Sequence, residues 1–174
     1  DDDLAHTIRG MVNHGMYKRY YHDVVGVNSR LDSIQAAVLR LKLPHLDEYC
    51  HARREASKYY NAGFRDNPNI ITPVTEKCGE ICDTCDCHVF HQYTLKITNG
   101  RRDAVHKHLN DLGIPNAIYY PVPLHRQKAY LDDRYKEEDF SVTNALSDTV
   151  ISLPMHTELD KEQQDLIISA VIEV

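Results

Sequence analysis

The side chains best suited to binding an anion lie together, just before a helix that the sequence predicts. Asn28, Ser29 and Arg30 supply an amide, a hydroxyl and a guanidinium ahead of an apolar helical pattern. Together with the backbone N–H groups of a helix entry, these groups can converge on one phosphate or carboxylate. An ordinary capping turn is the alternative, in which Ser29 caps the helix and Arg30 pairs with Asp32. Spacing alone leaves both interpretations open.

A second group of polar and aromatic side chains follows a predicted strand. The strand expected over residues 116–120 carries Tyr119 and Tyr120 at its end, and His125 comes soon after them. Loops that follow strand ends commonly carry ligand contacts. A proline-stiffened loop with solvated polar tips explains the same residues, so this segment is also a candidate rather than an assigned site.

Four of the five cysteines form a third group. They are Cys78, Cys82, Cys85 and Cys87, with His88 directly after them. These residue types suit zinc, but structural zinc sites usually join two short ligand pairs across a longer spacer. We therefore favour a surface loop with reduced thiols over a metal site. Cys50 stands apart from the others and is expected to be a half-buried structural thiol.

No complete catalytic set accompanies these groups, since the sequence has no G-x-S-x-G, P-loop or H-E-x-x-H motif. The composition is globular: 174 residues, 42% hydrophobic and 26% charged, with a net charge of −6. The acidic balance argues against a broad nucleic-acid surface. No run of about 18 apolar residues is present to span a membrane. We expect neither nucleic acid nor a membrane as a partner, and a cytoplasmic location.

The elements that must position these groups fall into two parts. In the first, Asp3 is predicted to cap a short helix that ends near Asn13. The aromatic, basic stretch after it is predicted to be an irregular loop. Apolar residues then recur at helical spacing from Leu31 to about Tyr60, and Pro44 is expected to kink this long helix rather than end it.

The second part alternates strands and helices. From residue 70 onward the predicted order is β, β, α, β, α, β, α, which favours an α+β fold with helices on one face of a mostly antiparallel sheet. Asp160 and Gln163 form a capping-box pattern at the start of the last helix. The predicted strands cover 70–74, 88–97, 116–120 and 150–153, and the helices cover 101–112, 143–149 and 160–174.

Motifs along nearly the whole chain resemble one known family. The runs NHGMYKRYYHDVVGVNSRLDSIQ, HVFHQYTLKI, GIPNAIYYPVPLH and SLPMHTELDKEQ are similar, in the same order, to the C-terminal part of the DegT/StrS-type sugar aminotransferases. These are fold-type-I enzymes that use pyridoxal phosphate to aminate keto-sugars linked to nucleotides. The GVNSRLD run resembles most closely the members that act on 3-keto-uronic acids in bacterial surface-polysaccharide synthesis.

The resemblance implies roles for five residues. In such enzymes two subunits of a homodimer share each active site, and an asparagine at the position of Asn28 reaches across the dimer to the cofactor phosphate. Arg30 would meet an acidic group of the sugar or its diphosphate. Tyr119, Tyr120 and His125 fall where the family contacts the nucleotide-sugar substrate. The implied amino donor is an amino acid, most simply glutamate.

The resemblance also implies that the Schiff-base lysine lies upstream of this sequence. We therefore expect no catalytic residue and no bound cofactor in this chain, and no activity from it alone, although the full-length protein would be a transaminase. Residues 1–30 would be a remnant of the large pyridoxal-phosphate domain with the cross-dimer loop, 31–62 a kinked bridging helix, and 63–174 the small domain. A non-catalytic nucleotide-sugar-binding or regulatory module is the alternative.

Overall fold

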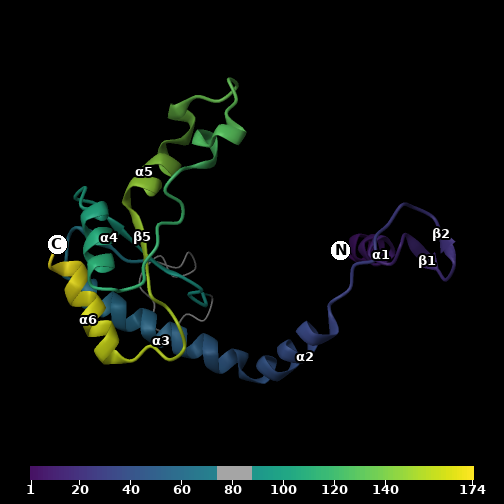
Figure 1. Ribbon diagram of the computed structural model, residues 1–174, viewed down its shortest axis with the longest axis horizontal. Coiled ribbons are helices and arrows are strands. Elements are labelled where there is room, and N and C mark those ends of the chain that lie inside the picture. The colour runs from purple at the N-terminus through teal and green to yellow at the C-terminus, as the bar shows by residue number, and fades with distance from the viewer. Residues whose placement is uncertain (74–87) are drawn as a thin grey trace. The chain divides into compact units, whose positions relative to one another are not determined.

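The computed structural model describes residues 1–73 and 88–174, and the chain divides into two compact units, 1–46 and 47–174 (Figure 1). Cys78, Cys82, Cys85 and Cys87 lie outside the described residues, so both interpretations of that cluster stay predictions. Cys50 is a half-buried free thiol, which agrees with its expected place. None of the described helices combines the length and the apolar character that crossing a membrane requires.

The first unit begins with a helix and a short β-ribbon. Asp1, rather than the predicted Asp3, caps the helix, because its carboxylate accepts a hydrogen bond of 3.1 Å from the N–H of Leu4. The ribbon lies in the stretch predicted to be irregular, and its strands are too short to show an alternating pattern. The elements are α1 (Asp2–Met11), β1 (Met16–Lys18), β2 (Tyr21–His22) and α2 (Ser33–Lys42).

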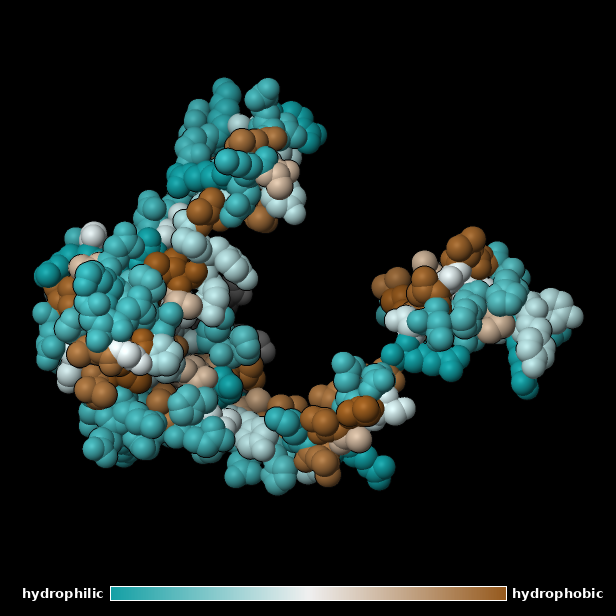
Figure 2. Space-filling view, viewed as in Figure 1, coloured by the Kyte–Doolittle hydropathy of each residue, from teal (hydrophilic) through white to brown (hydrophobic). Residues whose placement is uncertain are grey.

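The long helix predicted across Pro44 is divided in two. After α2, a single 3-10 turn covers Leu43–His45, and α3 (Leu46–Phe64) follows. Pro44 lies at the start of this turn and has no N–H to donate to the preceding helical turn, which accounts for the interruption. No residue of α2 is buried. Figure 2 shows apolar side chains exposed along this helix.

The second unit is a three-stranded antiparallel sheet with helices packed on it. β4 lies between β3 and β5, with Tyr93 opposite Leu153 and Ile70 opposite Ile97. The helices α4 and α6 lie side by side (Figure 1). This arrangement confirms the predicted α+β class with an antiparallel sheet. Besides α3, the elements are β3 (Ile70–Ile71), β4 (Tyr93–Ile97), α4 (Arg102–Asp111), α5 (Ser141–Thr149), β5 (Val150–Leu153) and α6 (Lys161–Ile172).

The core of the second unit follows from the alternation of β4. Tyr93, Leu95 and Ile97 are buried on one face, whereas Lys96 between them is exposed. Side chains of α3, α4, β5 and α6, with Phe90 and Ile114 from the segments between elements, complete the cluster. Aromatic side chains are concentrated around Tyr60. The centroids of the Tyr60 and Tyr93 rings are 4.8 Å apart.

The strand predicted over residues 116–120 is wrong as a strand. Only Ala117 pairs with the sheet, through two backbone hydrogen bonds with Ser152 of 3.1 and 2.8 Å. Pro115, at the next hydrogen-bonding position on one side, has no N–H to donate, so the ladder does not extend toward it. The chain leaves the edge of the sheet here and runs through short 3-10 helices before α5.

Candidate functional site

Asn28 lies on a short antiparallel contact with the segment that follows α1. It forms an isolated β-bridge with Asn13. On either side of it, the N–H of Val27 donates to the carbonyl oxygen of Met11 at the end of α1 at 2.8 Å, and the N–H of Ser29 donates to that of Val12 at 2.9 Å. These two N–H groups are therefore used within the loop and are not available to an anion. Asn28 itself is exposed to solvent.

Two glycines permit this contact. Gly15 has a φ of +75°, and a Cβ added to it would lie 1.8 Å from the carbonyl oxygen of Val24. A Cβ added to Gly26 would lie 2.1 Å from the backbone nitrogen of Gly15. Both positions therefore need a residue without a Cβ. The backbones of Gly15 and Gly26 therefore pack closely against each other and fix the path of the loop that carries Asn28.

The entry of α2 is not an anion site. Asp32, and not Ser29, caps the helix: its carboxylate accepts hydrogen bonds from the N–H groups of Ile34 at 2.8 Å and Gln35 at 3.3 Å. A carboxylate thus already occupies the positive end of the helix dipole, and it would repel a second anion there. The prediction that backbone N–H groups of this helix entry converge on an anion is wrong for that reason.

Arg30 makes a different contact from the one predicted by the capping-turn alternative. Its Nη2 donates to the amide oxygen of Asn13 at 3.2 Å instead of pairing with Asp32. This bond ties Arg30 to the residue that is bridged to Asn28. The donors left for an anion are therefore three side chains, all exposed: the amide of Asn28, the hydroxyl of Ser29 and the guanidinium of Arg30.

Tyr119 and Tyr120 lie in the second unit, where the chain leaves the sheet edge. Their ring centroids are 5.8 Å apart in an edge-to-face arrangement, and both rings are largely exposed. Tyr119 lines two neighbouring pockets and Tyr120 lines one of them. The structure therefore brings the two predicted tyrosines to one place, beside two cavities.

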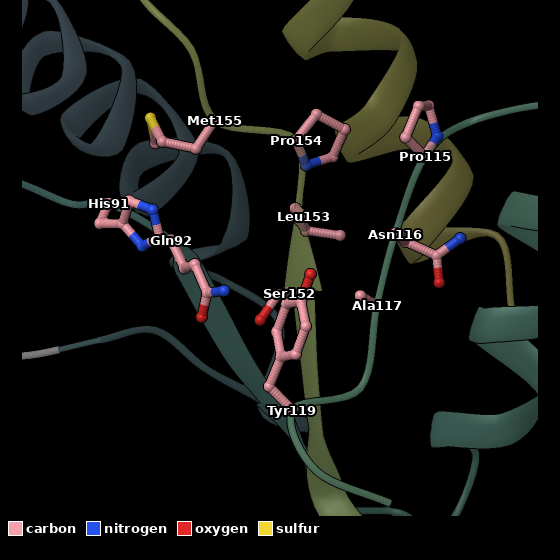
Figure 3. A pocket seen from close by; sticks show the side chains of 10 residues that line it. All are labelled: His91, Gln92, Pro115, Asn116, Ala117, Tyr119, Ser152, Leu153, Pro154 and Met155. Carbon is pink, nitrogen blue, oxygen red and sulfur yellow. The ribbon is translucent and has the colours of Figure 1, made fainter. Parts of the chain in front are cut away.

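The first cavity, here called the Gln92 pocket, has a volume of about 340 Å³ (Figure 3). Its walls come from the segment before β4, from residues 115–119 and from β5 with the residues after it. The polar side chains on these walls include two amides, an imidazole and a hydroxyl. The lining residues of interest are His91, Gln92, Asn116, Tyr119, Ser152 and Met155.

The second cavity, here called the Leu146 pocket, is larger and mostly apolar, with a volume of about 600 Å³. Side chains such as Val122, Leu124 and Leu146 line it together with the two tyrosines. Gln127 contributes a side-chain amide to this pocket, and the amide nitrogen donates to the carbonyl oxygen of Val122 at 3.3 Å. This pocket is suited to apolar or aromatic groups.

His125 is placed apart from the tyrosines. Its ring stacks on Phe140, with centroids 4.2 Å apart, and its Nε2 lies 3.4 Å from a carboxylate oxygen of Glu137. It lines a third cavity, which neither tyrosine lines. The guanidinium of Arg126 donates to Glu137 and, with His125 nearby, holds the pKa of that carboxyl below its ordinary value. The structure therefore separates His125 from the predicted tyrosine site.

Arg53 is a residue that the sequence interpretation missed. Its Nη1 lies 3.2 Å from each of three carbonyl oxygens, those of Phe90, His91 and Met155. Two of these residues, His91 and Met155, line the Gln92 pocket. No sequence signal points to this contact, since helical spacing says only that Arg53 lies on α3 and its partners are far along the chain.

Comparison with known proteins places this geometry in context. The sequence profile of the DegT/DnrJ/EryC1/StrS aminotransferase family matches residues 1–172. A UDP-N-acetyl-3-dehydro-alpha-D-glucosamine 3-aminotransferase of Acidithiobacillus ferrooxidans is 39% identical over 94% of this chain and 41% of its own length. A UDP-2-acetamido-2-deoxy-3-oxo-D-glucuronate aminotransferase of Pseudomonas aeruginosa is 36% identical over 98% of this chain and 44% of its own length.

A solved structure agrees with the sequence comparison. The crystal structure of DesV from S. venezuelae, in complex with a ketimine intermediate, has a TM-score of 0.86 to this chain and 36% identity. The match covers 99% of this chain and 44% of the DesV chain. The chain therefore spans less than half the length of the relatives that it matches.

Proposed function

The chain belongs to the DegT/DnrJ/EryC1/StrS aminotransferase family, and from that premise we propose that the full-length protein transfers an amino group to a keto-sugar linked to a nucleotide. The amino donor in this proposal is an amino acid, glutamate. Relatives named as aminotransferases of UDP-linked 3-keto sugars support the substrate class. The observation that carries the proposal is the family match over residues 1–172.

The cofactor in this proposal is pyridoxal phosphate, which family aminotransferases use. The donors at the Asn28 loop suit the two anions of this proposal: the exposed amide of Asn28 fits the cofactor phosphate, and the exposed guanidinium of Arg30 fits an acidic group of the substrate. When bound, the cofactor supplies the electron sink and the carrier for the amino group. Asn28 would hold the phosphate in the partner subunit's active site, and Arg30 would bind an acidic group of the substrate.

The tyrosines are proposed to contact the nucleotide-sugar. Their phenol groups and rings border the Gln92 and Leu146 pockets, which together offer polar and apolar surface beside one loop. His125 is proposed to contact the same substrate from its own cavity, where its ring stacks on Phe140. In this arrangement the chain binds and orients the substrate.

The lysine that carries the amino-group chemistry is proposed to lie in a part of the protein outside this sequence. A nucleophilic amine is needed for covalent attachment of the cofactor, and no lysine here stands in the family's lysine motif. The proposal therefore assigns no activity to this chain alone. It also includes a homodimer with shared active sites and a cytoplasmic location.

Spectroscopy of the full-length protein tests the proposal. The purified dimer should absorb in the near-visible range because of its bound cofactor, and this band should disappear when glutamate is added. A UDP-linked 3-keto sugar should then restore the band and yield an amino sugar detectable by mass spectrometry. The isolated chain serves as the control and should show neither change. A full-length protein that never responds to any amino donor would support the non-catalytic binding or regulatory alternative.

A further inference from the structure

The Gln92 pocket has a composition that selects among possible ligands. None of its described lining residues is a lysine, arginine, aspartate or glutamate, and His91 contributes an imidazole ring. A diphosphate or a carboxylate would be poorly stabilised there, because no permanent cation faces it. A neutral group with both polar and apolar surface fits these walls better.

The polar groups of the pocket differ in their availability. The Ser152 hydroxyl is hydrogen-bonded to Thr94 at 2.8 Å. The Asn116 amide nitrogen donates to the Asn110 side chain and the Ile114 carbonyl, both at 3.0 Å. The Gln92 amide, by contrast, has no hydrogen-bond partner among residues 1–73 and 88–174. Gln92 is therefore the side chain of this pocket that is ready to bind a ligand.

The Gln92 amide and the Tyr119 ring face the same opening. Figure 3 shows the amide reaching toward the space beside the phenol ring, over Ser152 of β5. A carboxamide offers a donor and an acceptor side by side, which matches the edge of a heterocyclic base. An exposed aromatic ring offers a stacking surface for the face of such a base.

The side chain of Arg53 connects two of the segments that form this pocket. Arg53 joins the carbonyl oxygens of His91 and Met155, which belong to the segment before β4 and to the segment after β5. A ligand that enters the pocket does not have to order these two segments first, and this lowers the entropic cost of binding.

We propose that the Gln92 pocket binds the heterocyclic base of the nucleotide-linked sugar, with the Gln92 amide on the base edge and the Tyr119 ring against its face. This inference rests on the proposed function, because it takes a nucleotide-sugar as the ligand. The neighbouring Leu146 pocket is a weaker candidate for the base, since its Gln127 amide already donates to the Val122 carbonyl. Arg53 is a positioning residue for the site.

Binding of UMP to the chain, followed by NMR, tests the proposal separately from transamination. UMP should shift the Gln92 side-chain amide and the backbone amides of residues 116–119, with saturation at millimolar concentrations. Ribose 5-phosphate, which has the same sugar and phosphate but no base, should leave these signals in place. Gln92→Leu, at an exposed position, should weaken UMP binding at least fivefold.

Gln127→Leu is the matched control, because it removes the same amide from the neighbouring pocket. It should leave UMP binding unchanged. The inference is wrong if UMP produces no shifts at these residues, if ribose 5-phosphate shifts them equally, or if Gln127→Leu weakens binding while Gln92→Leu does not. A full-length protein without transaminase activity would contradict the proposed function, whereas any of these three results contradicts only the base site.

Discussion

The Nη1 atom of Arg53 donates a hydrogen bond of 3.2 Å to the carbonyl oxygen of Met155. The two residues are 102 positions apart in the sequence. The same nitrogen lies equally close to two carbonyl oxygens just before β4. One half-buried side chain of α3 thus fixes both the segment that enters β4 and the segment that leaves β5.

Replacing Arg53 should therefore destabilise the second unit. Hydrogen bonds from a charged donor to partly buried carbonyls contribute roughly 2 kcal/mol, so Arg53→Ala should lower the free energy of unfolding by about that amount. Arg53→Lys should lose less, since it keeps the charge but not the planar guanidinium. Urea unfolding followed by circular dichroism measures both. Arg65→Ala, at an exposed position just after α3, is the control and should stay within about 0.5 kcal/mol of wild type.

Replacing Asn28 should weaken retention of pyridoxal phosphate by the full-length dimer. Asn28→Ala removes the exposed amide, and Asn28→Asp places a negative charge where a phosphate is proposed to bind, so the aspartate variant should lose more. The measurement is the ratio of cofactor to protein after gel filtration. Ser29→Ala, next to it in the same loop, keeps the N–H that holds the loop and should lose less cofactor than either Asn28 variant. Equal retention by all variants would remove Asn28 from the site.

The buried pair of Tyr93 and Asn61 should show strong coupling. The Tyr93 hydroxyl donates to the Asn61 amide oxygen at 2.6 Å, and burial raises the pKa of the phenol, so it stays protonated. Tyr93→Phe leaves a buried amide unsatisfied and should cost about 1–3 kcal/mol. The double variant with Asn61→Leu should cost less than the sum of the single changes. Additive losses in thermal unfolding would show that the hydrogen bond contributes nothing.

Glu137 should make the segment before α5 sensitive to acid. Its pKa is lowered from 4.5, first by the hydrogen bond from Arg126, so the folded state binds this proton less readily than the unfolded chain. The stabilising contribution is complete above the unfolded pKa and is lost as the pH falls through the lower folded pKa. NMR titration of the carboxyl should give a midpoint below 4.5. Arg126→Gln should move that midpoint upward, and an unchanged midpoint would contradict the assignment.

The exposed apolar side chains of α2 should cause the chain to self-associate when studied alone. Ile34 and Leu41 are 77% and 76% exposed, and no residue of the helix is buried. Ile34→Glu with Leu41→Lys should reduce the concentration dependence of the sedimentation coefficient. Gln35→Glu changes the charge on the same helix without removing apolar surface and should leave the association intact. A chain that is monomeric at every concentration would show that this surface does not cause self-association.

Local signals in the sequence were sufficient wherever a structure depends on neighbouring residues. The capping box at the start of α6 forms as predicted, with Asp160 accepting from the Gln163 N–H at 2.8 Å. Gly113 takes a φ of +71° just after Leu112, the C-cap of α4, as expected of a glycine that closes a helix. The alternating pattern before residue 97 predicted β4, although the strand begins at Tyr93 and not at His88.

Contacts between distant residues could not be predicted in this way. Ser29 and Asp32 are both residue types that cap helices well. The N–H of Ser29 is hydrogen-bonded to the segment after α1, and Asp32 caps α2 instead. The three acceptors of Arg53 meet only in the folded sheet. His125 follows Tyr119 and Tyr120 closely in sequence. Its ring nevertheless stacks on Phe140 and lines a different cavity.

The position of α6 in the chain has a consequence for biosynthesis. Its residues Ile167, Ala170 and Val171 are part of the core of the second unit, and Gln164 donates to the Ala56 carbonyl of α3 at 2.8 Å. During translation, α3 and the sheet therefore leave the ribosome before α6, the helix that completes their core. Until α6 emerges, their apolar surfaces are exposed to chaperones and to other nascent chains. Ribosomes stalled before residue 161 should accordingly carry an unfolded, protease-sensitive chain.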